Sequence, residues 1–457
     1  MKQAVTAIFD IGKTNKKFFL FDTNYSEVYR EYARFDEILD EDGYPTENLK
    51  SLVNWIGDVF SRILQSEKYE VTALNFSTYG ASLVHLGENS EVLTPLYNYT
   101  KPLDPELINS FFEKYGPQTN FAMTTGSLNE GMLNSGMQLY WLKHRKPTTF
   151  KKIKYSLHLP QYISFSFTGT PVSEYTSIGC HTGLWDYNKK DYHTWVYEEG
   201  IAKILPPIVS SDTGYFKSFN GKKIKIGVGI HDSSAALLTY TRNSRSKFLL
   251  VSTGTWSITL NPFSNELLTK QDVTDNCSNY MQITGKPVKS ARLFLGAEYS
   301  KQVKSLSKQF EVNEDYHKDI KFNLATYIEV SKKLEPILVG KTIETYGIKK
   351  KTKINYTSFE YAYHHLMIEL VTLQIKSIQK AQGENSIEKL YIDGGFSDND
   401  VYIKLLSYFL KNMELYSTDS SFGSALGAAM VISDGKLNSD FLEKNYGFKK
   451  QVPVLNK

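Results

Sequence analysis

Three turns rich in Asp, Gly, Thr and Ser follow apolar strands at widely separated points of the chain. They lie in residues 5–21 (VTAIFDIGKTNKKFFLF), 248–260 (FLLVSTGTWSITL) and 389–396 (KLYIDGGF). Such a turn exposes backbone N–H groups and a short hydroxyl or carboxylate at the edge of a sheet. These groups suit a phosphate or the metal ion that accompanies it. One such turn is common in hairpins, but three at strand ends favour a shared phosphate site.

The first turn begins with Asp10 and continues through Gly12, Lys13 and Thr14. A carboxylate at the end of a buried strand can hold Mg²⁺, directly or through water, while the backbone faces a phosphate. An ordinary hairpin, in which Asp and Asn satisfy the turn amides, explains the same residues. In the second turn the Thr253 hydroxyl and the Gly254 N–H are candidate phosphoryl contacts. The alternative is again a hairpin, whose Thr residues favour strands.

The third turn, Asp393-Gly394-Gly395, lies between a predicted strand and a predicted helix, with Asn399 shortly after it. Two consecutive glycines allow the backbone to approach a flat ligand or a phosphate closely. An ordinary strand-to-helix turn with an Asp or Asn helix cap is the alternative.

The segment GIHDSSAA at 229–236 is the most specific of the candidate sites. It follows a strand and opens a helix with small residues. Asp232 at that position can act as general base toward a substrate hydroxyl, and His231 can bond a sugar oxygen. The alternatives are that Asp232 is only an N-cap and that His231 is structural.

Cysteines and histidines predict no metal centre. Cys180 and Cys277 stand in unrelated contexts, so neither a disulfide framework nor a zinc-ligand spacing is expected. His364 and His365 fall within a predicted helix, where adjacent side chains point about 100° apart. No GxxxxGK[ST], GxGxxG or nucleophile-elbow motif follows any strand.

Length and composition indicate a globular protein of two large domains. The chain has 457 residues, 41% of them hydrophobic, and 53 basic and 49 acidic side chains leave a net charge of +4. This near balance predicts no nucleic-acid and no membrane partner, and the basic run at 349–353 is expected to be a solvated loop. No apolar run approaches the roughly 20 residues of a membrane span. The short apolar N-terminus is strand-like, so a cytoplasmic location is expected.

The pattern of predicted elements occurs twice. Residues 1–40 predict consecutive strands, residues 46–66 a helix and residues 74–80 a strand. The second half restarts with a strand at 224–229, the hairpin at 248–260, a long helix at 357–382 and a strand at 389–393. Helices at 105–115 and 135–145 fall in a less regular middle. We therefore expect a duplicated α/β chain with a cleft between two domains, at 1–222 and 223–440, and a tail at 441–457.

In this order the motifs resemble the FGGY family of carbohydrate kinases over nearly the whole chain. The resemblance rests on DIGKTNKK, STYGAS, FTGTPVSE, Trp195 with LPPIV, GIHDSSAAL, STGTWS, DGGFSDN and a closing LGAA helix. It implies two actin-like ATPase (ribonuclease H-like) domains with an inter-domain cleft. It also implies transfer of the γ-phosphoryl of ATP, with Mg²⁺, to a hydroxyl of a sugar or polyol.

The resemblance assigns roles to individual residues. Asp232 would be the catalytic base and Asp10 would assist Mg²⁺. The phosphates would be bordered by Gly12, Lys13, Thr14, Lys17, Thr253 and Gly254. Gly394, Gly395 and Asn399 would approach the nucleotide. The region 300–350 matches the family poorly, so no adenine contact is assigned there.

The STYGASLVHL stretch and the His231-Asp232 pair are most similar to kinases of deoxyketohexoses, of the rhamnulose and fuculose type. Ser82, Gln138 and His231 are expected to bind sugar hydroxyls, although rhamnulokinase-like sequences carry Asp at the position of Ser82. Lys13 replaces the family's usual Thr or Ser. The expected partner is a small sugar, bound by a monomer or homodimer. The alternatives are a non-catalytic actin-like nucleotide-binding regulator or scaffold, and a kinase of another sugar or polyol such as xylulose.

Overall fold

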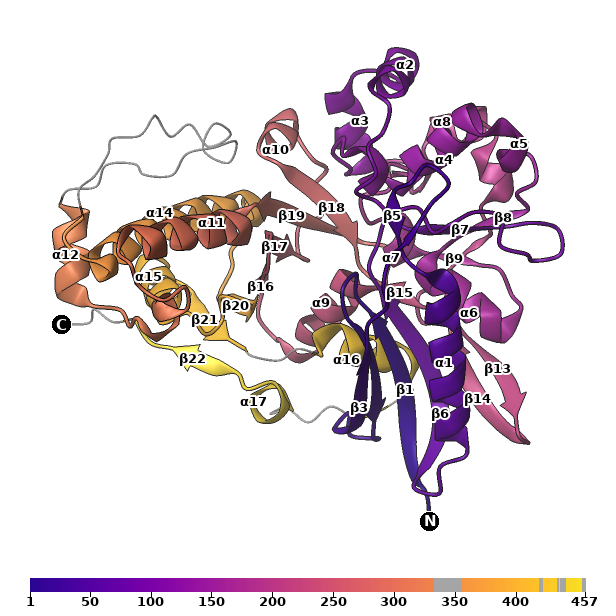
Figure 1. The fold of residues 1–457 in the computed structure, drawn as a ribbon, viewed down its shortest axis with the longest axis horizontal. Coiled ribbons are helices and arrows are strands. Elements are labelled where there is room, and N and C mark those ends of the chain that lie inside the picture. The colour runs from indigo at the N-terminus through magenta and orange to yellow at the C-terminus, as the bar shows by residue number, and fades with distance from the viewer. Residues whose placement is uncertain (333–355, 419–421, 434, 436–440, 454–457) are drawn as a thin grey trace.

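A computed structural model describes the chain except for residues 333–355, 419–421, 434, 436–440 and 454–457 (Figure 1). The basic run at 349–353 therefore lies outside the described residues. Two mixed sheets, one in each half of the chain, form the framework of the fold.

The first sheet has the order β13-β14-β6-β1-β2-β3, and the short strand β15 pairs with the end of β6. Strands β1, β2 and β3 are antiparallel, while β6 and β14 run parallel to β1. Strand β1 is almost entirely buried, as its apolar sequence predicts. The bounds are β1 (Gln3–Ile11), β2 (Lys16–Phe21), β3 (Glu27–Ala33), β6 (Tyr69–Thr78), β13 (Gly214–Phe219), β14 (Lys222–Gly227) and β15 (Ile230–His231).

The second sheet has the order β18-β19-β17-β16-β20-β21-β22. An antiparallel hairpin, β16 with β17, again has a parallel strand, β20, on its other side. The two sheets thus repeat one topology, as the duplicated pattern predicts. The bounds are β16 (Phe248–Thr253), β17 (Ser257–Asn261), β18 (Cys277–Met281), β19 (Pro287–Leu293), β20 (Lys389–Gly394), β21 (Glu414–Ser417) and β22 (Lys449–Gln451).

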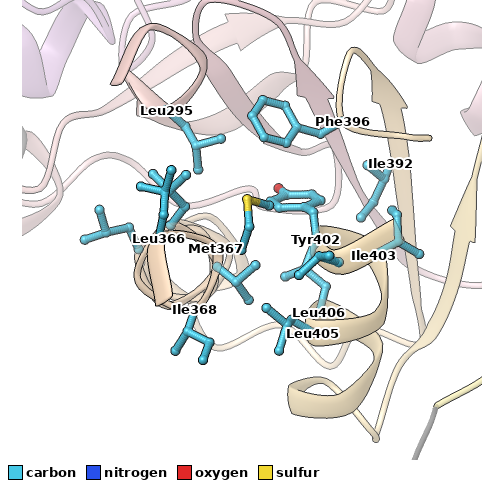
Figure 2. Close-up of a cluster of buried hydrophobic side chains, with 14 of the residues drawn as sticks. Leu295, Leu366, Met367, Ile368, Ile392, Phe396, Tyr402, Ile403, Leu405 and Leu406 are labelled. Carbon is cyan, nitrogen blue, oxygen red and sulfur yellow. The ribbon is translucent and has the colours of Figure 1, made fainter. Parts of the chain in front are cut away.

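The outer helices cover each sheet with an apolar face. Helix α1 (Leu49–Leu64) buries Leu52, Ile56, Val59, Phe60 and Ile63, which recur at helical spacing. In the second half the long α14 (Phe359–Gln382) packs on the sheet beside α11 (Leu295–Gln309), α12 (Leu324–Ser331) and α15 (Asp400–Phe409). Figure 2 shows side chains of α14, α15 and β20, among them Met367, Tyr402 and Ile392, meeting in this core.

Two helices lie between the sheets and join the halves (Figure 1). Helix α9 (Asp232–Asn243) crosses α16 (Gly423–Ile432) so closely that a Cβ on Gly427 would lie 1.8 Å from the Ala235 carbonyl oxygen. Although α16 is late in the sequence, it packs on β1 and β6 of the first sheet. Helix α9 in turn packs Leu237 and Tyr240 against β16 of the second sheet, so the two helices together couple the sheets.

The middle of the chain forms a helical insertion with an aromatic core around Trp195 and Phe111. Helices α2 and α4 occupy the ranges that the sequence predicts. The elements of this half are β4 (Ile38–Leu39), β5 (Pro45–Thr46), β7 (Leu83–Leu86), α2 (Pro105–Tyr115), α3 (Gln118–Thr125), η1 (Gly131–Leu133), α4 (Ser135–Arg145), α5 (Pro147–Phe150), β8 (Tyr155–His158), α6 (Leu159–Thr168), β9 (Ser173–Glu174), α7 (Tyr175–Ile178), β10 (Trp185–Asp186), β11 (Asp191–Tyr192), α8 (Thr194–Glu198), η2 (Ile201–Ile204) and β12 (Ile208–Val209). The second half adds α10 (Lys270–Thr274), η3 (Tyr316–Asp319) and α17 (Phe441–Asn445).

The sheets extend past two of the expected divisions of the chain. Strands β14 and β15 belong to the first sheet, although β14 crosses the limit at 222/223 and β15 lies wholly beyond it. Strand β22 lies within the expected tail and pairs with β21 at the edge of the second sheet. The domain limits of 222/223 and 440/441 stay predictions. Pairing with β6 and β21 joins segments that are far apart along the chain, so the local sequence could not show it.

Asn75 ties the first sheet to α16 and should matter for stability. Its Nδ2 donates to the Ala428 carbonyl at 2.9 Å, and its Oδ1 accepts from the Gly229 N–H at 3.1 Å. Asn75→Ala leaves the buried Gly229 N–H without its partner, at a cost of about 1–3 kcal/mol, while the Ala428 carbonyl keeps its bond within α16. We expect the unfolding free energy in a denaturant titration to fall by about that amount. Asn412→Ala, at an exposed position, is the control and should stay within about 0.5 kcal/mol. Equal effects of the two substitutions would contradict the coupling.

Candidate active site

Parallel strand ends bring Asp10 and Asp232 to the same edge of the first sheet. Asp10 on β1 lies opposite Ser77 on β6, and Ser77 lies opposite Ile230 on β15. Asp232 follows at the start of α9. The two carboxylates interact, because the negative charge of Asp232 is one of the causes that raise the pKa of Asp10.

Asp10 is a buried carboxylate with few compensating partners. Burial raises its pKa to about 6, opposed by the charge of Lys17 and a hydrogen bond from Ser424. Lys17 faces it across the hairpin with Nζ 4.0 Å from Oδ2, and the Ser424 hydroxyl donates to Oδ1 at 2.9 Å. Ser424 comes from α16, so both halves of the chain contribute to this corner.

Only one carboxylate oxygen of Asp232, Oδ1, takes part in the described contacts. This oxygen accepts from the Ser233 N–H at 2.6 Å and lies 3.3 Å from His231 Nε2. Burial raises the pKa of Asp232 to about 6, and the Ser233 hydrogen bonds oppose this rise. The N-cap of α9 is His231, so the alternative reading of Asp232 as the N-cap residue is wrong. The reason is that the helix already begins at Asp232.

A cavity of about 230 Å³ opens in front of Asp232. Its walls come from α9, the β16–β17 hairpin, the end of β20 and the start of α16. Asp393 is a second carboxylate in this wall. Burial raises its pKa to about 6, while the Tyr240 hydroxyl, which donates to it at 3.2 Å, and the charge of Lys17 oppose the rise. Lys17 is thus the cation that stabilises both Asp10 and Asp393.

Strand pairing and hydrogen bonds join the second turn to the third. Thr253 on β16 pairs with Gly394 on β20, and its hydroxyl donates to the Asp393 carbonyl at 2.6 Å and accepts from the Phe396 N–H at 3.0 Å. A Cβ on Gly394 would lie 2.0 Å from the Thr253 carbonyl oxygen, so only glycine fits there. The Gly254 N–H donates to Trp256 O within its hairpin. These groups therefore shape the turn, and their contact with phosphate stays a prediction.

A separate cavity of about 340 Å³ adjoins the glycine turn. Gly395 and Asn399 line it together with Tyr299, His317 and Phe396. Asn399 also has a structural task, since its side chain caps α15 through the Tyr402 N–H and donates to the Tyr363 hydroxyl at 2.8 Å. Residues 299–320 thus supply a pocket wall in the region for which the sequence assigned no contact.

The predicted residues of the first turn differ in exposure and in their bonding partners. Gly12 N–H donates to Asn15 O inside the turn, and Thr14 is exposed. Lys13 forms an ion pair with Glu37, with 3.0 Å between Nζ and Oε1. The buried Lys16, which the sequence reading did not single out, pairs with Glu47 at 2.9 Å and donates to the Lys13 carbonyl at 3.0 Å.

Ser82 and Gln138 are buried in the first half. The hydroxyl of Ser82 hydrogen-bonds with the Tyr79 side chain. Gln138 Nε2 donates at 2.6 Å to both Ala81 O and Met132 O, and its Oε1 has no partner among the described residues. Gln138 therefore fixes Ala81, whose φ is 60°. A role of either side chain in binding a sugar stays a prediction.

Comparison with known families decides the relationship. The N-terminal domain model of the FGGY family of carbohydrate kinases matches residues 5–238, and the carbohydrate kinase FGGY C-terminal domain model matches residues 245–439. The chain belongs to the FGGY family of carbohydrate kinases. The resemblance inferred from the sequence motifs is therefore confirmed.

Solved structures show the family's fold. A carbohydrate kinase from Novosphingobium aromaticivorans superposes with a TM-score of 0.83 at 23% identity, covering 100% of this chain and 95% of that one. A ligand-bound xylulose kinase from Lactobacillus acidophilus gives 0.78 at 16% identity, covering 99% and 94%. A Plasmodium falciparum glycerol kinase with ADP gives 0.75 at 15% identity, covering 97% and 92%. The predicted two-domain actin-like α/β fold is confirmed.

Curated relatives at low identity include rhamnulokinases. The protein from Halalkalibacterium halodurans is 22% identical over 261 residues, which is 54% of this chain and 54% of the relative. The protein from Mannheimia succiniciproducens is 22% identical over 396 residues, which is 82% of this chain and 78% of the relative. The chain thus spans about half the length of the first of these. In the part of the chain that the structure describes, no helix is long and apolar enough to cross a membrane.

The candidate active site has a neighbouring cluster that the sequence did not predict. One ligand atom each of Cys180, His181 and His231 lies within 4.8 Å of the others. The sequence shows no zinc-ligand spacing along the chain, and these three side chains come together only through the fold. The motif GCHTG placed Cys180 and His181 between glycines, which was the available signal.

An ion pair crosses between the halves near this cluster. Arg292 of β19 binds Glu130 of the insertion through both carboxylate oxygens, at 2.5 and 2.9 Å. Its charge acts on Cys180, His181 and Tyr280, so it belongs to the same electrostatic neighbourhood as the site. No motif in the sequence pointed to it.

Proposed function

We propose that this protein transfers the γ-phosphoryl group of ATP to a primary hydroxyl of a sugar, with Asp232 as the general base. The observation that carries the proposal is the position of Asp232. It lies in the wall of the 230 Å³ cavity, at the start of a helix, beside two further carboxylates and Lys17. Phosphoryl transfer needs positioning and charge compensation, and this arrangement supplies both.

The hydrogen bonds of Asp232 suit a base. Ser233 and His231 orient Oδ1, so Oδ2 faces the proton of the attacking hydroxyl. Burial raises the carboxylate's affinity for a proton, yet a pKa of about 6 keeps most of it ionised at neutral pH. Asp232 accepts the hydroxyl proton as the oxygen attacks the γ-phosphorus, and ADP leaves on the opposite side.

The residues at the phosphate end fit Mg²⁺. Asp10, Asp232 and Asp393 are carboxylates whose pKa values are all raised by burial, so a bound cation would stabilise their ionised forms. Carboxylate oxygens are ligands that Mg²⁺ prefers. Asp10 would hold the ion, which when bound neutralises phosphate charge. The charge of Lys17 acts on both Asp10 and Asp393, and the turns at Thr14, Thr253 and Gly254 would border the phosphates.

The nucleotide is proposed to extend from this cavity into the pocket of about 340 Å³ beside Gly395 and Asn399. Gly394 has a φ of 87° and brings the backbone of the turn against Thr253. Because Gly394 and Gly395 carry no side chains, a flat base can approach the backbone of this turn. The aromatic walls formed by Tyr299 and Phe396 suit an adenine ring.

A sugar panel should identify a ketose as the acceptor. We expect a 6-deoxyketohexulose such as L-rhamnulose or L-fuculose, in line with the rhamnulokinase relatives and the His231-Asp232 pair. A site that hydrogen-bonds one hydroxyl rejects an analogue lacking it by up to about 10⁴–10⁵-fold. The measurement is kcat/KM in an ADP-coupled assay with ketoses, aldoses, glycerol and gluconate. Preference for glycerol, gluconate or an aldose would overturn the ketose class but keep the kinase.

The pH profile of kcat/KM should have an acidic limb near pH 6. Below that pH Asp232 is protonated and cannot accept the hydroxyl proton, so activity rises with pH through its pKa of about 6 and then levels. An ordinary Asp would place the limb near about 3.9. Saturating Mg²⁺ keeps Asp10 ionised, so the limb reports Asp232. Constant activity from pH 7 to pH 5, with the fold intact by circular dichroism, would contradict this.

The main alternative is an actin-like nucleotide-binding regulator or scaffold. Such a protein needs the hairpins and the glycine turn but no desolvated carboxylate opposite them. Xylulose is the alternative sugar, because a xylulose kinase shares the fold. ATP turnover measured with and without each ketose separates the classes. Nucleotide binding without sugar-dependent turnover of any panel member would favour the regulator.

A further inference from the structure

His231 has a second set of neighbours that the proposed phosphoryl transfer does not use. Cys180 Sγ lies 3.3 Å from His231 Nε2, and His181 follows Cys180 in the loop after α7. The three side chains come from two distant segments and are all more than nine-tenths buried. One ligand atom from each lies within 4.8 Å of the other two.

We propose that Cys180, His181 and His231 bind a thiophilic divalent cation such as Zn²⁺ beside Asp232. One sulfur and two imidazole nitrogens are a common ligand set for this ion. Bonds of about 2.3 Å to sulfur and about 2.0–2.1 Å to nitrogen make the edges of a tetrahedral site about 3.3–3.6 Å long. The Cys180 Sγ to His231 Nε2 distance of 3.3 Å fits such an edge. His181, whose ligand atom lies within 4.8 Å of the other two, would move toward them to complete the set around the ion.

The protonation of His181 is suited to a ligand. Its Nδ1 lies 3.1 Å from the Leu133 carbonyl oxygen, which can only accept, so Nδ1 carries the proton. With the proton on Nδ1, the Nε2 lone pair is available to an ion. Metal-bound histidines typically donate their other nitrogen to a carbonyl or carboxylate in this way.

The backbone around the cluster is also unusual. His181 has a φ of 40°, in the left-handed region that costs a non-glycine residue about 1–3 kcal/mol. Gly80 faces both imidazoles, and a Cβ there would lie 3.1 Å from His231 Nε2 and 3.3 Å from His181 Cε1. Glycine at position 80 therefore keeps the space between the two rings clear of a side chain.

The fourth ligand position points to Asp232, whose Oδ1 lies 3.3 Å from His231 Nε2. Cys180 binds as a thiolate and releases its proton to solvent. An ion that takes the Asp232 carboxylate removes the base, so Zn²⁺ inhibits sugar phosphorylation. This consequence rests on the proposed function, whereas binding of the ion does not.

Co²⁺ titration of the full-length protein, without Mg²⁺, nucleotide or sugar, tests the site. We expect one equivalent to bind with a thiolate-to-cobalt charge-transfer band in the near ultraviolet, and Zn²⁺ to displace it. Cys180→Ser should abolish the band. Cys277→Ser should keep it, because this second buried cysteine is not one of the three clustered side chains. His181→Asn should weaken binding at least about ten-fold, since one ligand is lost.

Circular dichroism and thermal unfolding without metal establish that each variant is folded. A wild-type protein without the band at stoichiometric Co²⁺, or a band that survives in folded Cys180→Ser, would overturn the metal site. Zn²⁺ binding without inhibition of an active kinase would leave the three-residue site standing and overturn the assignment of Asp232 as its fourth ligand.

Discussion

Asp232→Asn should lower kcat about 10²–10⁴-fold, the usual effect of removing a general base. The amide has the size of the carboxylate and its Oδ1 still accepts from Ser233, but it cannot take the proton of the sugar hydroxyl. We expect the fold, the KD of an ATP analogue and the KD of the sugar to change little. Steady-state kinetics measure kcat, and calorimetric titration measures the two KD values.

Asp104→Asn is the matched control for this substitution. Asp104 also lies at the start of a helix, where it caps α2, but on the insertion rather than in the cavity. Its replacement should leave kcat unchanged within two-fold. Turnover of Asp232→Asn close to that of the wild type would remove Asp232 from the mechanism, even if the protein is a kinase.

Asp10→Ala should reduce turnover by a factor on the order of 10²–10³, because metal clamping of the phosphates supplies several kcal/mol of transition-state stabilisation. The substitution removes the carboxylate that we expect to hold Mg²⁺ and leaves Lys17 and Ser424 in place. The Mg²⁺ concentration for half-maximal activity should rise, while the KD of the sugar should stay the same.

Asp10→Asn distinguishes charge from packing at this position. The amide keeps the volume and can still accept from Ser424, so a protein that loses activity equally in both variants depends on the charge. If instead only sugar affinity falls in either variant, with kcat and the Mg²⁺ requirement unaltered, Asp10 belongs to the sugar pocket and the metal assignment is wrong.

Local sequence patterns determined much of the fold. The apolar runs ending in Asp10, Thr253 and Asp393 become β1, β16 and β20, because alternating or continuous apolar residues followed by Gly and Asp specify a strand and its turn within a few residues. The long helix expected at 357–382 is α14, at Phe359–Gln382. The order of these motifs was enough to indicate the family, which the domain models confirm.

Contacts between distant segments could not be inferred in the same way. The bond from Ser424 to Asp10 joins residues 414 positions apart, and it exists because α16 packs on the first sheet. Local patterns also could not assign partners. The ion pair of Lys13 with Glu37 and the bonds of the Gln138 amide to Ala81 and Met132 appear only in the fold, while the expected roles of both residues toward phosphate and sugar stay predictions.

The sequence by itself thus determined which residues end strands and begin helices, because those choices depend on neighbours along the chain. Tertiary structure alone decided which of these ends meet. Parallel pairing of β1, β6 and β15 sets Asp10 near Asp232, and the return of the insertion to β15 sets Cys180 and His181 against His231. The raised pKa values of Asp10, Asp232 and Asp393 follow from the same packing, since desolvation depends on the segments that cover a carboxylate.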